Sequence, residues 1–347
     1  MMDGNATAAY DGRTPSLAVW SHPMSRLYRR TLLAAAATLA FAANAAPGAW
    51  PEKPIRIVVT FGAGGASDIV AREIATPLAQ MLGQPVIVDN KPGAGGTIGG
   101  SEVARSAPDG YTLMLSNSTP LSIGPFTLAK LPYDPVHQFT HIAMLGVAPV
   151  LIMANPKAGI NSLKDVPKAV GAAGGHMGFG SGGPGSIGQI VGEMMKADMK
   201  LNLDHVPYRG GAPMSADLMA GTIPLGIDVI TAYVPMVKAG QITALAVTSR
   251  TRSPLLPNVP TVTEAGYSDL LADNYFGVSG PPGMPAPVVE KIRAALADIV
   301  ARPATLKRFE ELGVLPAYAG PAAFTSVVEK QIRDWTPAIK ASDLGPK

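Results

Sequence analysis

The chain has 347 residues, a length that usually corresponds to two domains rather than one. Hydrophobic residues make up 47% and charged residues only 15%, a balance that excludes a disordered chain and indicates a large core. The net charge of +3 does not indicate nucleic-acid binding, and the lack of cysteine excludes disulfides, thiolate catalysis and cysteine-held metals.

The N-terminal segment has the pattern of an exported protein. We interpret residues 1–23 as an upstream extension, with translation starting at Met24. Three arginines within 26–30 precede an apolar run over 32–42, and residues 43–45 (ANA) form a cleavage site, so 1–45 is predicted to be removed. The apolar run is shorter than the ~20 residues that span a bilayer, which favours a cleaved signal peptide over an anchor. The sequence leaves the Sec and twin-arginine routes open.

A strand, a glycine turn and a helix start follow one another at the beginning of the mature chain. The β-branched residues of 55–59 predict a buried strand, and apolar residues at helical spacing predict a helix over 69–82. Glycines within 62–65 let the backbone turn sharply between them. Unpaired N–H groups and the positive end of the helix dipole make such a helix start an anion site.

The same arrangement is predicted twice more. A strand over 85–88 leads through the loop 89–97 to a helix over 98–106, and the loop 181–186 leads to a helix over 187–197. Two neighbouring parallel strands with glycine loops at their C-terminal ends direct two helix starts at one crevice, where open α/β sheets bind ligands.

The remaining elements also alternate, which predicts an α/β fold with mostly parallel sheets. Residues 121–139 are predicted to be irregular, and the strand over 141–154 is predicted to change direction near Ala148-Pro149, where we place a domain crossover. Ser162 and Asp165 have the spacing of a capped helix start. Further strands are predicted over 111–115, 177–180, 203–208, 222–229, 244–248 and 273–278. Further helices are predicted over 212–220, 234–239, 287–302 and 321–339.

Several motifs, unspecific singly, become specific in their order. They resemble the Bug/TctC family, the periplasmic solute-binding receptors of tripartite tricarboxylate transporters, from about Trp50 to the C-terminus. The motifs are 61–68 (FGAGGASD), 90–96 (NKPGAGG), 108–111 (PDGY), 206–211 (VPYRGG), 244–248 (ALAVT) and 260–266 (PTVTEAG).

The resemblance implies a type II periplasmic-binding-protein fold, in which two α/β domains joined by a hinge close on a ligand. By this likeness domain one is 47–148 plus 275–347, and domain two is 149–274. It implies a monomer without catalysis, cofactor or metal that hands its ligand to a membrane permease or a sensor protein. The family's ligands are di- and tricarboxylates, acidic amino acids and aromatic acids, with a carboxylate held by backbone amides of the first two loops.

Three positions depart from the family pattern. Ala63 stands where the family usually has proline, Gln189 where it often has histidine, and Tyr275 where it often has tryptophan. The loops themselves remain, so anion binding is still expected, but the identity of the ligand stays open.

The predicted ligand-binding residues come from the three glycine loops and from strand ends. They are Phe61, Gly64, Gly65, Ala66, Ser67, Asp68, Ala94, Gly95, Gly96, Thr97, Ser116, Asn117, Ser181, Gly182, Ser186, Gln189, Tyr208, Arg209, Gly210 and Asp228.

The charged residues among them also have plainer roles. Asp68 can hold a ligand amino group, but an acid in a first helical turn is favourable without a ligand, and we prefer that structural role. Arg209 can pair with a distal carboxylate or with a surface acid. Asp228 can accept from a ligand hydroxyl or amine, or cap the next segment, and Lys91 can add positive potential or be a solvated charge.

The uncharged candidates are equally open. The polar side chains of 116–119 can reach a ligand or cap a turn. Tyr208 and Tyr275 can wall the ligand or be ordinary half-buried aromatics.

The main alternative is a nicotinamide-dependent oxidoreductase of the Rossmann type. The loop 62–67 follows a strand and opens a helix, and Asp89 ends the second strand as a ribose ligand would. However, Ser67 replaces the third glycine or alanine of the fingerprint, and the acid is farther along than ~20 residues. A serine hydrolase is disfavoured because no Gly-x-Ser-x-Gly motif occurs, and the histidines lack metal-ligand spacing.

Overall fold

The computed structural model describes residues 50–127 and 130–341. The predicted upstream extension and signal peptide, 1–45, lie outside the described residues. Within the described ranges, no helix combines the length and apolar character needed to cross a membrane.

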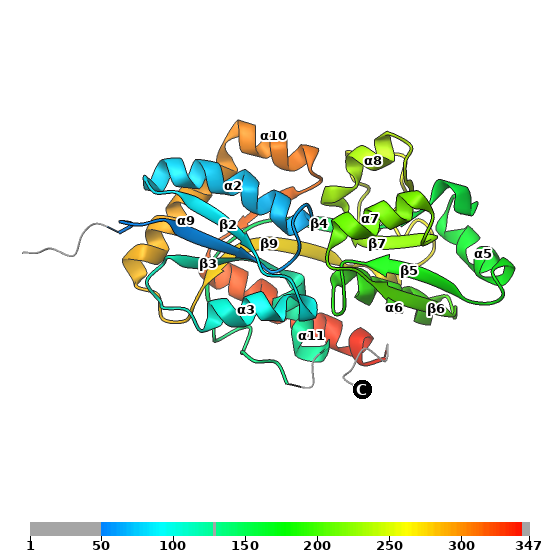
Figure 1. Ribbon diagram of the computed structural model, residues 1–347, viewed down its shortest axis with the longest axis horizontal. Coiled ribbons are helices and arrows are strands. Elements are labelled where there is room, and N and C mark those ends of the chain that lie inside the picture. The colour runs from blue at the N-terminus through cyan, green and yellow to red at the C-terminus, as the bar shows by residue number, and fades with distance from the viewer. Residues whose placement is uncertain (1–49, 128–129, 342–347) are drawn as a thin grey trace, which may run out of the picture. The chain divides into compact units, whose positions relative to one another are not determined.

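The described chain forms two lobes. Lobe one contains three parallel strands in the order β2-β1-β3 (Figure 1). Each predicted strand and helix of the two glycine-loop units is present, and α2 begins three residues earlier than predicted because residues 66–68 already belong to its first turn. The elements are β1 (Ile55–Val59), α2 (Ala66–Leu82), β2 (Val86–Asn90), α3 (Thr97–Ala104) and β3 (Thr112–Asn117).

Two long strands connect the lobes. In β4 (Thr140–Ala154), residues up to Pro149 pair with β9 (Asp273–Gly280). Residues from Val150 pair with β7 (Leu225–Val229) and β8 (Thr243–Val247). The change of partners falls where the sequence predicted a change of direction. The full extent of the two domains, with domain two at 149–274, stays a prediction.

Lobe two is centred on β5, which has parallel neighbours on both sides. Figure 1 shows α6 and α7 on opposite sides of the strands β5 and β7. The capping box predicted for Ser162 and Asp165 is present before α5. The elements are α5 (Val166–Ala172), β5 (Met177–Ser181), α6 (Ile187–Asp198), β6 (Leu203–Pro207), α7 (Gly211–Ala220), β7 (Leu225–Val229), α8 (Val234–Lys238) and β8 (Thr243–Val247).

The prediction of mostly parallel sheets is wrong. The strand pairs of β4 with β7, β8, β9 and β10 and of β3 with β9 are antiparallel. The chain passes between the lobes in both directions, so the connecting strands run against the strands they join. The sheet is therefore mixed.

The C-terminal part contains two elements that the sequence did not predict. Helix α10 (Pro303–Glu311) follows directly after α9 (Ala286–Ala301), is short and mostly polar, and buries only Phe309. Strand β10 (Leu315–Ala319) pairs with β4, and α11 (Pro321–Ala341) ends the described chain. The segment predicted as irregular after β3 contains a π-helical turn, Thr119–Ile123, and the short α4 (Gly124–Thr127).

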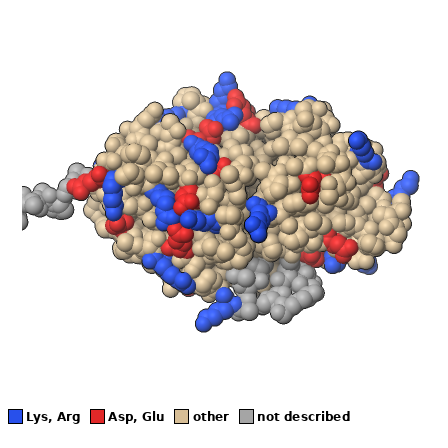
Figure 2. Space-filling view, in the orientation of Figure 1, with Lys and Arg blue, Asp and Glu red and all other residues tan. Residues whose placement is uncertain are grey.

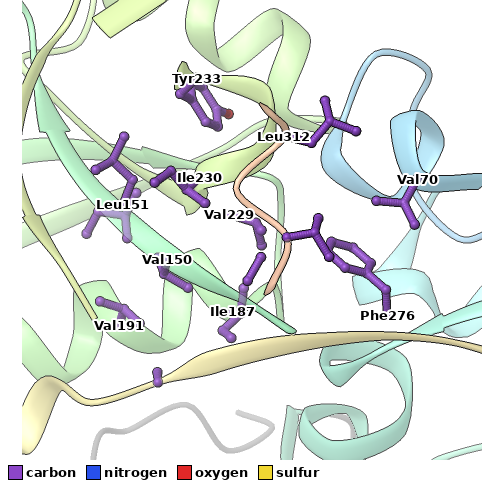
Figure 3. Packing of buried hydrophobic residues seen from close by; sticks show 14 of the residues in the cluster. Val70, Val150, Leu151, Ile187, Val191, Val229, Ile230, Tyr233, Phe276 and Leu312 are labelled. Carbon is purple, nitrogen blue, oxygen red and sulfur yellow. The ribbon is translucent and has the colours of Figure 1, made fainter. Parts of the chain in front are cut away.

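One hydrophobic core cluster includes residues from both lobes. Figure 3 shows Val70 of α2 and Phe276 of β9 in the same cluster as Ile187 of α6 and Val229 of β7. The lobes are thus in contact through apolar side chains beside the connecting strands, which fixes how the glycine loops of one lobe meet those of the other.

Candidate functional site

The start of helix α2 leaves backbone donors free. Its N-cap residue is Gly65, so no side chain caps the helix, and the N–H groups of Ala66 and Ser67 have no acceptor among the residues that the structure describes. The carboxylate of Asp68 instead accepts from the Gly64 N–H (2.9 Å) and from Arg72 Nε (3.0 Å). Burial would raise the pKa of Asp68, but these hydrogen bonds outweigh it and lower the pKa below its usual value.

The second glycine loop has an unusual backbone. Gly93, Ala94, Gly95 and Gly96 all have positive φ, with 47° at Ala94, a conformation that costs a residue with a side chain. A Cβ atom on Gly96 would lie 2.9 Å from the Thr60 hydroxyl oxygen, so only glycine fits there. The loop therefore brings its backbone close to its surroundings, as a cradle for a ligand requires.

The third loop, between β5 and α6, satisfies some of its donors with its own side chains. Ser186 is the N-cap and accepts from the Gln189 N–H (3.3 Å), while Gln189 Oε1 accepts from the Gly185 N–H (2.6 Å). Ser186 also donates to the hydroxyl of Ser181 (3.0 Å), which lies 2.6 Å from His205 Nε2. Burial lowers the pKa of His205 to about 4, so this imidazole is neutral at neutral pH.

The loops of the two lobes touch backbone to backbone. A Cβ atom on Gly62 would lie 2.4 Å from the carbonyl oxygen of Arg209, and one on Gly95 would lie 2.8 Å from that of Pro184. Real Cβ atoms do not come so close, so both glycines are needed for the lobes to meet in this way. The structure is a closed form.

An inner cavity of about 30 Å³ lies between the lobes. Lobe one contributes the start of α2 and the end of β3, and lobe two contributes the start of α6, the end of β7 and the start of α7. The lining residues are Phe61, Gly65, Ala66, Ser67, Asn117, Thr119, Gly182, Ser186, Ile187, Gly211, Asp228, Val229 and Asn274.

A larger outer cavity of about 400 Å³ adjoins the inner cavity at Phe61 and Gly182. Arg209 is the charged side chain of its lining, and it is exposed and has no ion-pair partner in the described part of the chain. The lining residues are Phe61, Pro92, Gly93, Ala94, Gly95, Gly96, Ile98, Gly182, Gly183, Pro184, Tyr208 and Arg209.

The charged side chains of the visible face do not form one basic patch. Figure 2 shows lysine and arginine interspersed with aspartate and glutamate over this face. This face therefore presents no broad positive field to attract an anion.

Asp228 is the one ionisable side chain in the lining of the inner cavity. Its carboxylate accepts from the Val229 N–H (2.8 Å) and from the hydroxyl of Tyr233 (2.8 Å). Burial raises the pKa of Asp228 to about 6, and these two hydrogen bonds only partly oppose the effect.

The structure brings most of the predicted site residues together. Eight line the inner cavity, namely Phe61, Gly65, Ala66, Ser67, Asn117, Gly182, Ser186 and Asp228. Five more line the outer cavity, namely Ala94, Gly95, Gly96, Tyr208 and Arg209. The other seven belong to neither lining: Gly64, Asp68, Thr97, Ser116, Ser181, Gln189 and Gly210.

The polar residues outside the linings are engaged within the protein. Thr97 donates to the Ala94 carbonyl (2.8 Å), and Ser116 donates to Ser279 (2.7 Å). Tyr275 is buried with its hydroxyl 3.2 Å from that of Ser122, so it does not wall the cavity. Lys91 pairs with Asp89 (3.5 Å).

The sequence reasoning missed some lining residues of the inner cavity. Ile187, Gly211 and Val229 directly follow predicted residues, and Thr119 lies in the polar stretch 116–119 that was considered for ligand contact. Asn274 belongs to another strand, β9, and only the folded arrangement places it at the cavity.

A mixed α/β fold with a cleft between two lobes that a pair of strands connects defines a solute-binding protein of the periplasmic type. The chain belongs to the tripartite tricarboxylate transporter family receptors, TctC, because the model of that family matches residues 70–344.

Solved structures agree with this assignment. The periplasmic binding protein BugD is 32% identical, with a TM-score of 0.82 over 86% of this chain and 100% of that one. Rpa4515 of R. palustris, solved with adipate, is 30% identical, with a TM-score of 0.83 over 86% and 100%. MatC of Rhodopseudomonas palustris, solved with bound malate, is 29% identical, with a TM-score of 0.79 over 84% and 100%. The predicted family and fold class are confirmed.

Proposed function

We propose that this receptor captures a small organic carboxylate in the inner cavity. The observation that carries the proposal is the uncapped start of α2, where the free N–H groups of Ala66 and Ser67 lie in the lining of a cavity shared by both lobes. Such donors, together with the helix dipole, bind a carboxylate without any cationic side chain.

The ligands of two relatives support a dicarboxylate. Adipate and malate, named with Rpa4515 and MatC, both carry two carboxylates. In this chain one carboxylate lies on the start of α2, and the other extends into the outer cavity towards Arg209. A guanidinium can hold a carboxylate with two parallel hydrogen bonds.

Ligand binding drives closure of the lobes. The inner cavity takes its lining from both lobes, so a ligand makes its full set of contacts only in the closed form. A ligand shifts an equilibrium by its difference in affinity for the two states, which here favours closure.

The protein acts in the periplasm after export by a cleavable signal peptide, as a monomer without catalysis or cofactor. It delivers the ligand to the membrane permease of a tripartite transporter or to a sensor protein. Its family supports this binding role over the nicotinamide-dependent oxidoreductase that the first glycine loop also allowed.

Calorimetric titration of the mature protein with dicarboxylates and monocarboxylates of equal chain length tests the proposal. Arg209→Ala should weaken dicarboxylates about five-fold, the effect of about 1 kcal/mol expected for an exposed charge pair, and leave monocarboxylates unchanged. Failure of every carboxylate to bind would refute the proposed function, and equal loss for both classes would remove Arg209 from its role.

A further inference from the structure

A further cavity lies apart from the cleft, at the point where β4 changes its partners. Its volume is about 220 Å³, and it shares no lining residue with the inner or the outer cavity. Pro149, which is the last residue of β4 to pair with β9, belongs to its lining. The rest of the lining comes from residues 249–255 and from residues 306–316 of α10 and β10, so we call it the α10 cavity.

Both lobes contribute to the α10 cavity. Helix α10 is fixed to lobe one by the ion pair of Arg308 with Glu73 of α2 (3.0 Å). The segment 249–255 follows β8, which pairs with the lobe-two half of β4. The two sides meet closely, because a Cβ atom on Gly313 would lie 2.9 Å from Cγ2 of Ile230.

The walls of the α10 cavity are largely apolar and partly open to water. Leu306 is 37% exposed and Leu315 is 40% exposed, which places both among the most exposed large hydrophobic residues of the described chain. Apolar side chains gathered around a concave site are typical of a ligand pocket. The apolar lining includes Pro149, Pro254, Leu255, Leu306, Val314 and Leu315.

The lining contains two ionisable side chains, and only one of them is free. Arg252 donates from Nε to Glu264 (2.8 Å) and from a terminal nitrogen to the Pro257 carbonyl (3.0 Å). The Glu310 carboxylate has no hydrogen-bond or ion-pair partner within residues 50–127 and 130–341. The free charge beside this apolar site is therefore negative, which favours a cationic ligand.

We propose that the α10 cavity is a second binding site, which takes a small amine with an apolar ring. The ring lies between the leucines of the two lobes, and the ammonium lies at Glu310. An apolar cavity of about 150 Å³ holds benzene, so 220 Å³ has room for a ring with a two-carbon chain. The proposal concerns a site and a ligand class separate from those of the cleft.

Two probes of equal size test the ligand class. The mature protein is titrated calorimetrically with 2-phenylethylamine and with 2-phenylethanol, which differ in the charge of their end group at neutral pH. The amine should bind about five-fold more tightly, the upper range for an exposed charge pair. Benzylamine, which lacks one CH₂, should bind about four-fold more weakly than 2-phenylethylamine. Failure of the amine to bind, or equal binding of the alcohol, would overturn the inference.

Two substitutions on α10 separate the apolar part of the site from its charge. Leu306→Gln should weaken both probes about five-fold, because the ring loses an apolar contact. Glu310→Gln should reduce the affinity of the amine to that of the alcohol and leave the alcohol unchanged.

Each substitution has a matched control. Met81→Gln removes a similarly exposed apolar side chain, 39% exposed, from α2 outside this cavity. Glu311→Gln removes a neighbouring carboxylate that is paired with Arg308 (3.2 Å) and does not line the cavity. Both controls should keep full affinity for the amine, and thermal melts check that all four variants are folded. An equal loss in a variant and its control would overturn the inference.

Amide NMR spectra recorded during the titration with 2-phenylethylamine locate the site. The amide signals of Val314 and Leu315 should shift, and those of Ala66 and Ser67 in the inner cavity should not. Shifts confined to the residues of the cleft would show that the amine binds there, and would overturn the inference.

Discussion

The first and third glycine loops both lead from a strand into a helix, and they treat the first turn of that helix differently. At α2 the N-cap is Gly65 and no side chain caps the helix. At α6 the N-cap is Ser186, and the Gln189 side chain accepts from the Gly185 N–H as well. Both helices leave the N–H groups of their first two residues without an acceptor in the described part of the chain, but a side chain caps the third N–H of α6 and none caps α2.

The starts of α2 and α6 both belong to the lining of the inner cavity, so each lobe can offer backbone N–H groups to an anion. Because the walls come from different lobes, a ligand that needs both can hold the lobes together.

Converting the first loop to the chemistry of the third should have the largest effect. In Gly65→Asp, the new carboxylate caps α2 from within and repels a ligand anion, which we expect to cost about 2–3 kcal/mol, or about 30- to 150-fold in affinity. The backbone of Gly65 is extended, so the substitution fits it. Gly65→Ala adds the Cβ without the carboxylate and measures the steric part in the same titration. Unchanged affinity in Gly65→Asp would contradict an anion site at α2.

The second-largest effect is expected when the first glycine loop is kept from contacting the Arg209 backbone of the other lobe. The Cβ atom of Gly62→Ala would lie 2.4 Å from the Arg209 carbonyl oxygen across the cleft. Such overpacking costs about 1–3 kcal/mol, so we expect affinity to fall about 5- to 150-fold. Small-angle scattering should show that the variant stays open with ligand. The control is Gly171→Ala, where no atom lies within 4 Å. Full affinity in Gly62→Ala would mean that binding does not require this closed form.

The negative charge on Asp228 should make the free energy of unfolding depend on pH. Its pKa is raised to about 6 by burial, so the favourable protonated form is lost as the pH rises through 6. Ligand-free Asp228→Asn should therefore be more stable than the wild type at pH 8, by about 1–2 kcal/mol after solvent screening, and the gain should shrink towards pH 4. Denaturant melts across this range measure it. A gain independent of pH would contradict an ionised, desolvated Asp228.

Removing the cap of the third loop should have the smallest effect. Ser186→Ala loses the hydrogen bond from the Gln189 N–H, which costs about 1 kcal/mol and lowers Tm by about 2–4 °C. No such cap exists to be lost at Gly65, so Gly65→Ala should not lower Tm in this way. Calorimetric melts of both variants compare them, and an equal loss of stability at the two loops would remove the distinction between them.

Local signals account for what could be predicted from the sequence. The β-branched strand 55–59, the glycines after it and the periodic helix that follows are read from neighbouring residues, and they appear as expected. The cap at Ser162 was likewise visible from its spacing to Asp165.

Long-range arrangements account for what could not. The preferred structural role of Asp68 agrees with its hydrogen bonds from the Gly64 N–H and Arg72, which are local, so it is not among these. The antiparallel pairing of β4 and β9 depends on how the chain passes between lobes, and the approach of Asn274 to the cavity follows from that pairing.

The central claim is that a ligand carboxylate lies on the backbone N–H groups at the start of α2. Amide NMR spectra of the isotopically labelled protein, recorded during titration with adipate, test it most directly. The account predicts that the amide protons of Ala66 and Ser67 shift strongly downfield as they gain a charged acceptor, and that the shift is lost in Gly65→Asp. Saturable binding that leaves both amides unmoved, while signals elsewhere shift, would contradict the account.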